Sequence, residues 1–193
     1  MSHAKSNPQL VLRPQDLLVL LRLSLVRPAD DTPTYAVLAA ELALTASEVH
    51  GAVGRAIASH LAVKDEKGRP RARLESLRLF VQHGARYCFP ATRGPQTRGV
   101  PTGYAAPPLK ELIRSPAGDP PPVWPDKDGP VRGETLYPLY PTAPQAAARN
   151  PPLYELLALF DAIRGGSARE RALAVQLLDK RWSGDVPSSS SVP

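Results

Sequence analysis

The sequence predicts a mainly α-helical protein with one small β-hairpin. Apolar residues recur at helical spacing in six stretches, and each stretch opens on a proline or on a residue that commonly caps helices. Alternation typical of strands is confined to residues 86–105. Residues 106–149 are crowded with proline, which has no backbone N–H and disfavours regular helix and interior strand. We therefore expect an N-terminal domain (1–105), a connecting segment (106–149) and a C-terminal helical pair.

The first helix is predicted from Pro14 to about Val26. Proline suits the first helical turn because its missing N–H would be unpaired there anyway. Asp16 in the same turn opposes the helix dipole. Leucines cover more than one face of this segment, which is typical of a helix buried against several neighbours.

The next two helices are predicted to form a helix-turn-helix between Thr32 and Leu61. The first runs from Thr34 to Leu42. After a short break, Thr45–Glu48 fits a capping box, in which the threonine caps the third amide and the glutamate reaches back to the cap. The second helix should therefore start at about Ala46.

One face of that second helix is apolar and the other is small and polar. The apolar face is formed by Val49, Val53, Ala56 and Ile57, and the opposite face by Ser47, His50, Gly51, Gly54, Arg55 and Ala58. Short side chains let a helix backbone approach the floor of a DNA major groove, where serine, histidine and arginine can bond base edges. The same pattern also fits an ordinary pair of helices in a helical core.

Charge favours the DNA interpretation. The chain has 24 lysines and arginines against 18 acidic residues, a net charge of +6. Residues 55–98 alone hold ten basic residues and three acidic ones, so the positive charge follows directly upon the candidate recognition helix. Basic residues in that position would meet DNA phosphates. A basic surface without a nucleic-acid partner is the alternative.

A basic turn and a fourth helix are predicted next. Residues 64–69 form the turn, Pro70 stands at the start of the helix, and the helix is expected to end at about His83 because Gly84 suits the position after a helix.

Beyond it, residues 86–90 and 99–105 are predicted to pair as a β-hairpin across the loop 92–98. The tip carries Arg93 and Arg98, which can bind phosphate or enter a minor groove. This hairpin is the predicted wing, and a plain surface hairpin is the alternative.

The proline-rich segment is predicted to run in extended or polyproline II conformation. It is either a flexible linker, or a ligand for a proline-recognising domain, or a segment partly packed over a domain. Five apolar residues favour packing: Trp124, Leu136, Tyr137, Leu139 and Tyr140.

Residues 150–183 are predicted to form an antiparallel helical hairpin. Asn150 caps the first helix, Gly165–Gly166 ends it, and Ser167–Glu170 gives a second capping box. The pair either caps the same core or contacts a second copy or another protein. Residues 184–193 are predicted to be a disordered tail.

The sequence contains no phosphate loop, dinucleotide fingerprint, HExxH or CxxC pattern, and its four histidines are spread without ligand spacing. We therefore expect no enzyme, no catalytic residues, no metal and no cofactor. The single cysteine, Cys88, fits a reducing cytosol, and thus a cytoplasmic protein. The leucine-rich run 17–26 is broken by Arg22 and Ser24, so no membrane span is expected.

The segment Tyr35–Val63, YAVLAAELALTASEVHGAVGRAIASHLAV, resembles the helix-turn-helix of winged-helix transcriptional regulators of the MarR type. The usual pattern of that family is matched at Leu38–Ala39, Thr45–Glu48 and Leu61–Val63. Ala43 stands at the turn, where a glycine is common. The resemblance implies a winged helix-turn-helix domain that binds double-stranded DNA. A predicted fourth helix departs from that pattern, because it precedes the predicted wing.

The later part of the chain resembles uncharacterised bacterial regulators found with toxin genes, including winged-helix antitoxins of the abortive-infection type. The resemblance lies in the stretches ARYCFP, RGVPT and LLALFDAIRGG with ARERALA. This second resemblance implies an autorepressor or antitoxin that binds its own promoter and neutralises a toxin protein.

Twelve residues form the predicted DNA-binding set. They are Thr34, Tyr35, Thr45, Ser47, His50, Gly51 and Arg55 on the helix-turn-helix, and Lys67, Arg69, Arg71, Arg93 and Arg98 on the basic segment. The predicted function is a DNA-binding repressor with residues 46–60 on the bases and a basic wing on the phosphates. The alternative is an antitoxin or adaptor that captures a protein partner through the C-terminal helices. A homodimer is expected of a repressor that reads two-fold operators.

Overall fold

The structure is a computed structural model that describes residues 10–27, 29–113 and 118–183; the predicted disordered tail lies outside these residues. The described part is mainly helical with two small sheets, which confirms the predicted mainly α class. The N-terminal elements are α1 (Pro14–Leu23), α2 (Tyr35–Leu42), α3 (Ala46–Ala58), β1 (Ala62–Lys64), β2 (Pro70–Ala72), α4 (Leu74–Leu79), a π-helical turn (Phe80–Gly84) and α5 (Ala85–Cys88). The C-terminal elements are β3 (Arg93–Pro101), β4 (Pro122–Pro125), β5 (Val131–Leu136), α6 (Ala143–Arg149), α7 (Pro151–Gly165) and α8 (Ala168–Trp182).

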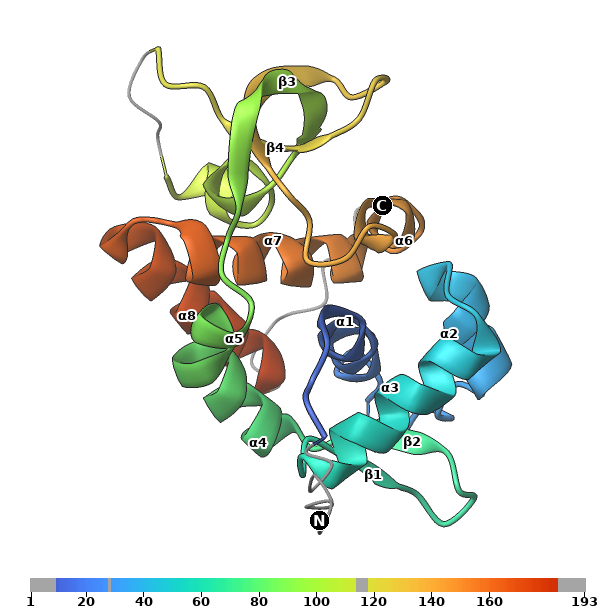
Figure 1. Cartoon of the computed structure of the whole chain (residues 1–193). Helices are drawn as coiled ribbons and strands as arrows, with labels where there is room; N and C mark the ends of the chain where they lie inside the picture. The colour runs from blue at the N-terminus through green and yellow to red at the C-terminus, as the bar shows by residue number, and fades with distance from the viewer. Residues whose placement is uncertain (1–9, 28, 114–117, 184–193) are drawn as a thin grey trace, which may run out of the picture.

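Helix α1 lies at the centre of the N-terminal half, between α3 and α7 (Figure 1). Pro14 occupies its first turn and Asp16 accepts the backbone N–H of Arg13 at 2.9 Å, so the predicted start is correct. The apolar run from Leu17 to Leu21 is at most 1% exposed. Burial on all sides explains why leucine covers more than one face of this helix.

Helices α2 and α3 form the predicted pair. Thr34 caps α2, and Thr45 with Glu48 makes the predicted capping box of α3. Ala43 takes the left-handed conformation that glycine favours at a turn, with φ of 51°. The chain axis turns by 108° between the two helices. This angle falls in the range typical of helix-turn-helix motifs.

A β-hairpin follows α3 directly. Strands β1 and β2 pair antiparallel with Lys64 opposite Pro70, and residues 65–69 form the connecting loop. Asp65 organises this loop because its carboxylate accepts the backbone N–H groups of Lys67 and Arg69 at 2.9 and 2.8 Å. The predicted helix start at Pro70 is therefore wrong: a fixed φ and a missing N–H suit the edge of a sheet as well as a first helical turn.

The predicted hairpin 86–105 is also wrong. The helix that begins at Leu74 passes through the π-helical turn and ends only at Cys88, so residues 86–88 are helical. Gly84 does not end the helix. A Cβ at Gly84 would lie 3.1 Å from the ring of Phe80, so this glycine makes room for an aromatic side chain.

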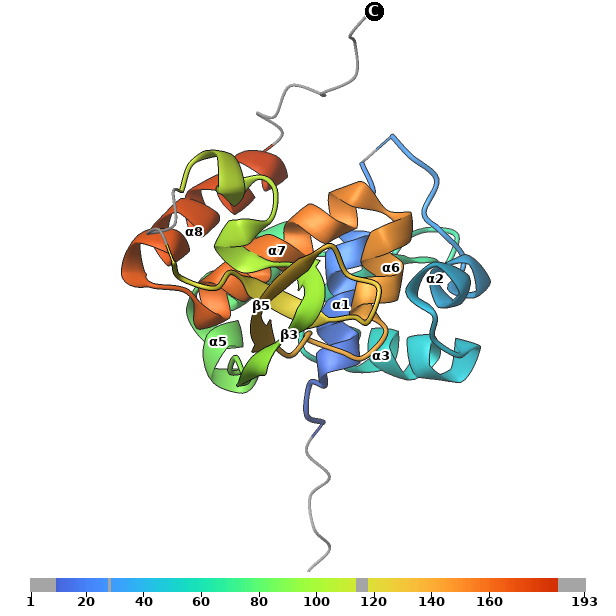
Figure 2. The ribbon, with the colours of Figure 1, turned by 90° about the horizontal axis from the view of Figure 1, so that it is seen from above.

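The expected loop 92–98 is strand β3. It pairs antiparallel with both β4 and β5, which pair parallel with each other, so the three strands close on themselves. The close approach of β3 to β4 requires glycine, because a Cβ at Gly99 would lie 2.1 Å from the carbonyl oxygen of Trp124. Trp124 is 1% exposed, which confirms that the proline-rich segment is partly packed. The sheet lies over α7 (Figures 1 and 2).

The C-terminal helical hairpin forms as predicted. Asn150 accepts the backbone N–H of Leu153 at the start of α7, and Ser167 with Glu170 makes the second capping box at the start of α8. Helix α7 is buried along its length and contacts α1, α5, α6 and α8. The buried residues of the N-terminal elements and of the C-terminal hairpin belong to one continuous core.

A buried carboxylate joins α7 to the sheet. Asp161 is 2% exposed and accepts hydrogen bonds from the hydroxyl of Thr102 at 2.6 Å and the indole N–H of Trp124 at 2.7 Å. The guanidinium of Arg164 donates to the same carboxylate at 2.8 Å and to the carbonyl of Tyr137 at 2.6 Å. Tyr154, about two helical turns before Asp161 on α7, donates its hydroxyl to the carbonyl of Pro101, and burial raises the pKa of Tyr154 to about 12.

Within the described ranges, no single helix is long and apolar enough to cross a membrane. Helices α2 and α3 taken together reach that length and composition, with the 108° bend between them.

We predict that Asp161→Asn lowers the free energy of unfolding by about 3–5 kcal/mol, because Arg164 would keep a buried charge without its counter-ion. Urea denaturation followed by tryptophan fluorescence measures the change. Asp128→Asn is the control, because the Asp128 side chain is 76% exposed. Equal midpoints for the two variants would contradict the structural role of Asp161.

Candidate nucleic-acid interface

The outward face of α3 is small and polar, as predicted. Val49, Val53 and Ala56 are at most 1% exposed and pack on the core. The exposed positions of the helix are Ala46, Ser47, His50, Gly54 and Ala58. No large side chain projects from the middle of this face, so another molecule can approach the α3 backbone closely.

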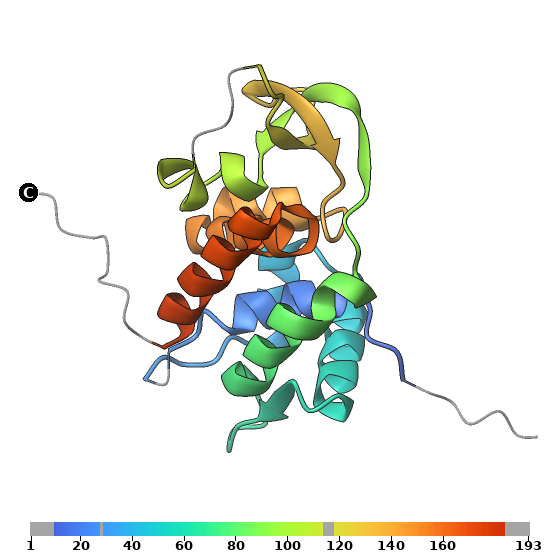
Figure 3. The same cartoon turned by 90° about the vertical axis from the view of Figure 1, so that its left-hand side faces the viewer.

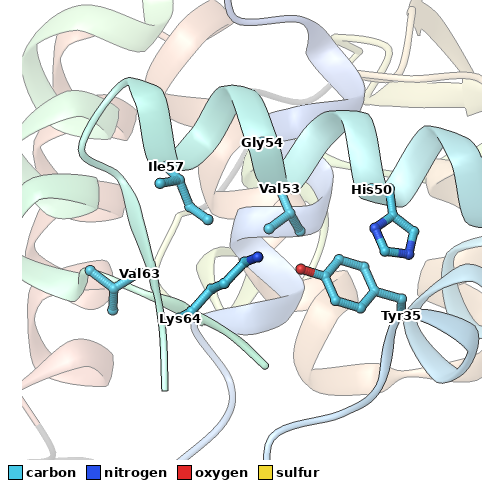
Figure 4. Close-up of a pocket in the computed structure, with 7 residues that line it drawn as sticks. All are labelled: Tyr35, His50, Val53, Gly54, Ile57, Val63 and Lys64. Atoms are coloured by element: carbon cyan, nitrogen blue, oxygen red, sulfur yellow. The ribbon is translucent and has the colours of Figure 1, made fainter. Parts of the chain in front are cut away.

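A groove runs beside this face, between α3, the start of α2 and strand β1. Its volume is about 590 Å³, and it is lined by Tyr35, His50, Val53, Gly54, Ile57, Val63 and Lys64 (Figure 4). The rings of Tyr35 and His50 stack with centroids 3.9 Å apart and planes 1° from parallel. Partial burial raises the pKa of Tyr35, and its hydroxyl points toward the amino group of Lys64.

The predicted exposure of Arg55 is wrong. Its guanidinium donates two hydrogen bonds of 2.7 Å to the carboxylate of Asp16, which is fully buried. These bonds to Asp16 raise the pKa of Arg55. Gly51 makes room for the guanidinium, because a Cβ at Gly51 would lie 3.2 Å from the nearest terminal nitrogen of Arg55. Helical spacing placed Arg55 opposite the apolar face, but a long side chain can bend back toward a buried acid on a neighbouring helix.

Glu48 is occupied at the first turn of α3. Its carboxylate accepts the backbone N–H of Thr45 at 2.7 Å and the Thr45 hydroxyl at 2.8 Å, and the Tyr140 hydroxyl donates to it at 3.1 Å. The bond from the Thr45 amide is the main cause of the lowered pKa of Glu48. The Thr45 side chain is thus engaged in capping, while Ser47 and His50 remain exposed.

The basic side chains of the β1–β2 hairpin mostly have partners inside the chain. Lys67 pairs with Asp31 at 3.2 Å, and Arg69 donates to the carbonyl of Thr32 at 2.8 Å. Arg71 likewise donates to the carbonyl of Asp30, at 2.8 Å. Lys64 is exposed and forms no ion pair with any acid that the structure describes.

Arg93 and Arg98 lie far from this hairpin. Both belong to β3, at the opposite end of the molecule from β1 and β2 (Figure 1). Arg93 pairs with Glu134, and Arg98 donates to the carbonyl of Gly129 at 3.2 Å. They do not join α3 because the expected loop 92–98 is a strand of the other sheet.

Of the predicted residues, the structure therefore brings Tyr35 and His50 into contact beside the groove, and Thr34 and Ser47 are exposed at the starts of α2 and α3. Gly51 instead lies against the guanidinium of Arg55. The sequence interpretation missed Lys64 and Val63 as groove residues. A signal was present, since Ala62–Lys64 and Pro70–Ala72 are short runs on either side of Asp65–Arg69, a loop with glycine, which is a hairpin pattern.

In the part of the chain that the structure describes, no three or more His, Cys, Asp or Glu side chains are grouped so that they could hold a metal ion. Comparison of the chain with protein families, curated proteins and solved structures gives no match.

We predict that Arg55→Ala lowers the free energy of unfolding by about 3 kcal/mol, because Asp16 would be left buried and charged without a partner. Chemical denaturation measures the loss. Adding Asp16→Asn to Arg55→Ala should restore part of the stability, since the unpaired charge is then removed. A wild-type midpoint for Arg55→Ala would show that the ion pair does not hold α3 on α1.

Proposed function

We propose that this chain is a DNA-binding regulator, with α3 as the recognition helix and the β1–β2 hairpin as the wing of a winged helix-turn-helix. The observation that carries the proposal is the arrangement of three consecutive elements. Helix α2 turns into α3 at 108°, the hairpin follows α3 directly, and the outward face of α3 carries only small or polar side chains. Such a helix can lie in a major groove.

Ser47 and His50 are the proposed contacts to base edges. Both are exposed near the N-terminal end of α3, the part of a recognition helix that commonly meets the bases. Gly54 is exposed with open space at its Cβ position, so it lets the α3 backbone lie close to the floor of a DNA major groove. Arg55 is engaged with Asp16, so α3 does not supply the arginine-to-guanine contact that is commonest in DNA recognition.

Phosphate contacts are proposed for Thr34 and Tyr35 at the start of α2 and for Lys64 on β1. Lys67 and Arg69 can join them, because the ion pairs that they form with Asp31 are exposed and such pairs contribute only about 0–1 kcal/mol. DNA phosphates can therefore compete with Asp31 for these cations. The number of phosphate contacts is small, so the dependence of binding on salt should be shallow.

The alternative function, an antitoxin or adaptor that acts through the C-terminal helices, has no specific support in the described residues. The apolar side chains of α7 are buried in the core, and α8 exposes mainly polar residues such as Arg169, Gln176 and Lys180. A toxin partner, the repressor role and the MarR-type and antitoxin resemblances stay predictions.

We expect selection from a random duplex pool to enrich one short sequence motif. Within that motif, Ser47→Ala and His50→Ala should each weaken binding by about 1–3 kcal/mol and relax the preference at a particular base pair. Fluorescence anisotropy on matched and single-mismatch duplexes measures both effects. His60→Asn is the histidine control, because asparagine tolerates the positive φ of 58° at this exposed position.

Lys64→Met should weaken binding to all sequences alike and reduce the slope of log K against log salt by about 1. Lys110→Met is its matched control, since Lys110 is exposed on the other half of the molecule. Absence of any enriched motif, with binding no stronger than that of an unrelated basic protein, would overturn the proposed function.

A further inference from the structure

The helical segment 74–88 presents one face to the core and one to the outside. Its inner face is formed by Leu77, Val81 and Ala85, which are buried completely. Its outer face is formed by Glu75, Leu79, His83 and Tyr87, which are all exposed. Figure 3 shows this segment, in green, at the front of the molecule with no other described element before it. These four residues form the outer stripe of the segment.

Both faces repeat every four residues, which a regular α-helix cannot sustain. With 3.6 residues per turn, a four-residue repeat drifts by about 40° at each step. The π-helical turn Phe80–Gly84 contains the extra residue that compensates for this drift. The outer stripe therefore runs straight along the segment instead of winding toward the core.

The outer stripe exposes two large apolar side chains. The Leu79 side chain is 49% exposed and Tyr87 is 75% exposed. Leu79 and Tyr87 lie about two turns apart on the same straight, uncovered face, so one element packed along the segment would cover both side chains.

The two ends of the segment 74–88 carry opposite charges beside the outer stripe. Glu75 lies at the N-terminal end with its side chain 74% exposed. At the C-terminal end the guanidinium of Arg86 lies 5.2 Å from the ring centre of Tyr87. Glu75 also pairs with Arg78, but Arg78 reaches Asp179 as well, and an exposed pair of this kind holds its carboxylate weakly.

We propose that the outer stripe is the interface with a second copy of this chain, packed antiparallel about a two-fold axis near residue 81. In this arrangement Glu75 of one copy meets Arg86 and Tyr87 of the other, and Leu79 meets His83. Each contact occurs twice, as a self-complementary two-fold interface requires. The proposal concerns assembly in the absence of DNA, so it stands or fails independently of the proposed function.

Sedimentation equilibrium on the full chain without DNA tests the interface. We expect a dimer of the 20.8 kDa chain. Tyr87→Ser should raise the dissociation constant of the dimer by about thirtyfold, as loss of a buried aromatic anchor does. Circular dichroism should show unchanged folding, because the side chain is exposed. A wild-type chain that stays monomeric up to its solubility limit, or a dimer that Tyr87→Ser leaves unchanged, would overturn the proposal.

A charge exchange tests the pairing of the two ends. Glu75→Arg alone and Arg86→Glu alone should each raise the dissociation constant by about tenfold, because like charges would meet across the interface. The double variant should return it toward the wild-type value. Failure of the double variant to recover would contradict the contact between Glu75 and Arg86.

Disulfide trapping tests the orientation, with Cys88→Ser as the common background. Antiparallel packing predicts that a chain carrying Leu79→Cys, mixed with a chain carrying His83→Cys, forms a cross-linked heterodimer under mild oxidation. Parallel packing would instead cross-link the Leu79→Cys chain efficiently to itself. The second result, or no cross-link in either case, would overturn the antiparallel arrangement.

Discussion

The ion pair between Asp16 and Arg55 fixes how the candidate recognition helix is presented. Asp16 is fully buried at the first turn of α1, and a buried carboxylate needs a charged and hydrogen-bonded partner. Arg55 supplies two parallel hydrogen bonds of 2.7 Å from α3, which set the rotation of that helix about its own axis. The face that remains outward carries serine, histidine and glycine. Because the Arg55 side chain turns toward Asp16, this face is nearly neutral and its side chains are small or polar. Any contact of α3 with bases would then have to come from Ser47 and His50.

A second buried aspartate, Asp161, joins elements of the C-terminal half in a similar way. Asp161 on α7 gathers the hydroxyl of Thr102, the indole of Trp124 and the guanidinium of Arg164, so a segment crowded with proline is held against a helix by hydrogen bonds as well as by packing. Helix α7 also packs on α1, and Tyr140 donates to Glu48 at the first turn of α3. The position of the candidate interface therefore depends on packing and hydrogen bonds from both halves of the chain, including residues distant in the sequence.

The distribution of charge illustrates why sequence counts mislead at an interface. The ten basic residues between 55 and 98 suggest a strongly positive surface beside α3. In the structure, Arg55 is held in a buried pair, Arg93 and Arg98 lie on the other sheet, and Lys67 and Arg69 share Asp31. Attraction to phosphate at the proposed DNA surface then depends chiefly on Lys64 and on exposed pairs that phosphates can displace.

The sequence by itself determined the features that depend on neighbours within about one helical turn. Caps at Thr45, Asn150 and Ser167 were predicted because a side chain and a free amide three residues away are enough to form them. The burial of α1 and the two faces of α3 followed from apolar periodicity. Only the tertiary structure decided the direction of the Arg55 side chain, the β1–β2 hairpin, the helical state of residues 85–88 and the pairing of β3. Each of these depends on a partner distant in the sequence or on a local pattern with two solutions: proline suits both a strand edge and a helix start, and glycine can either end a helix or admit an aromatic ring.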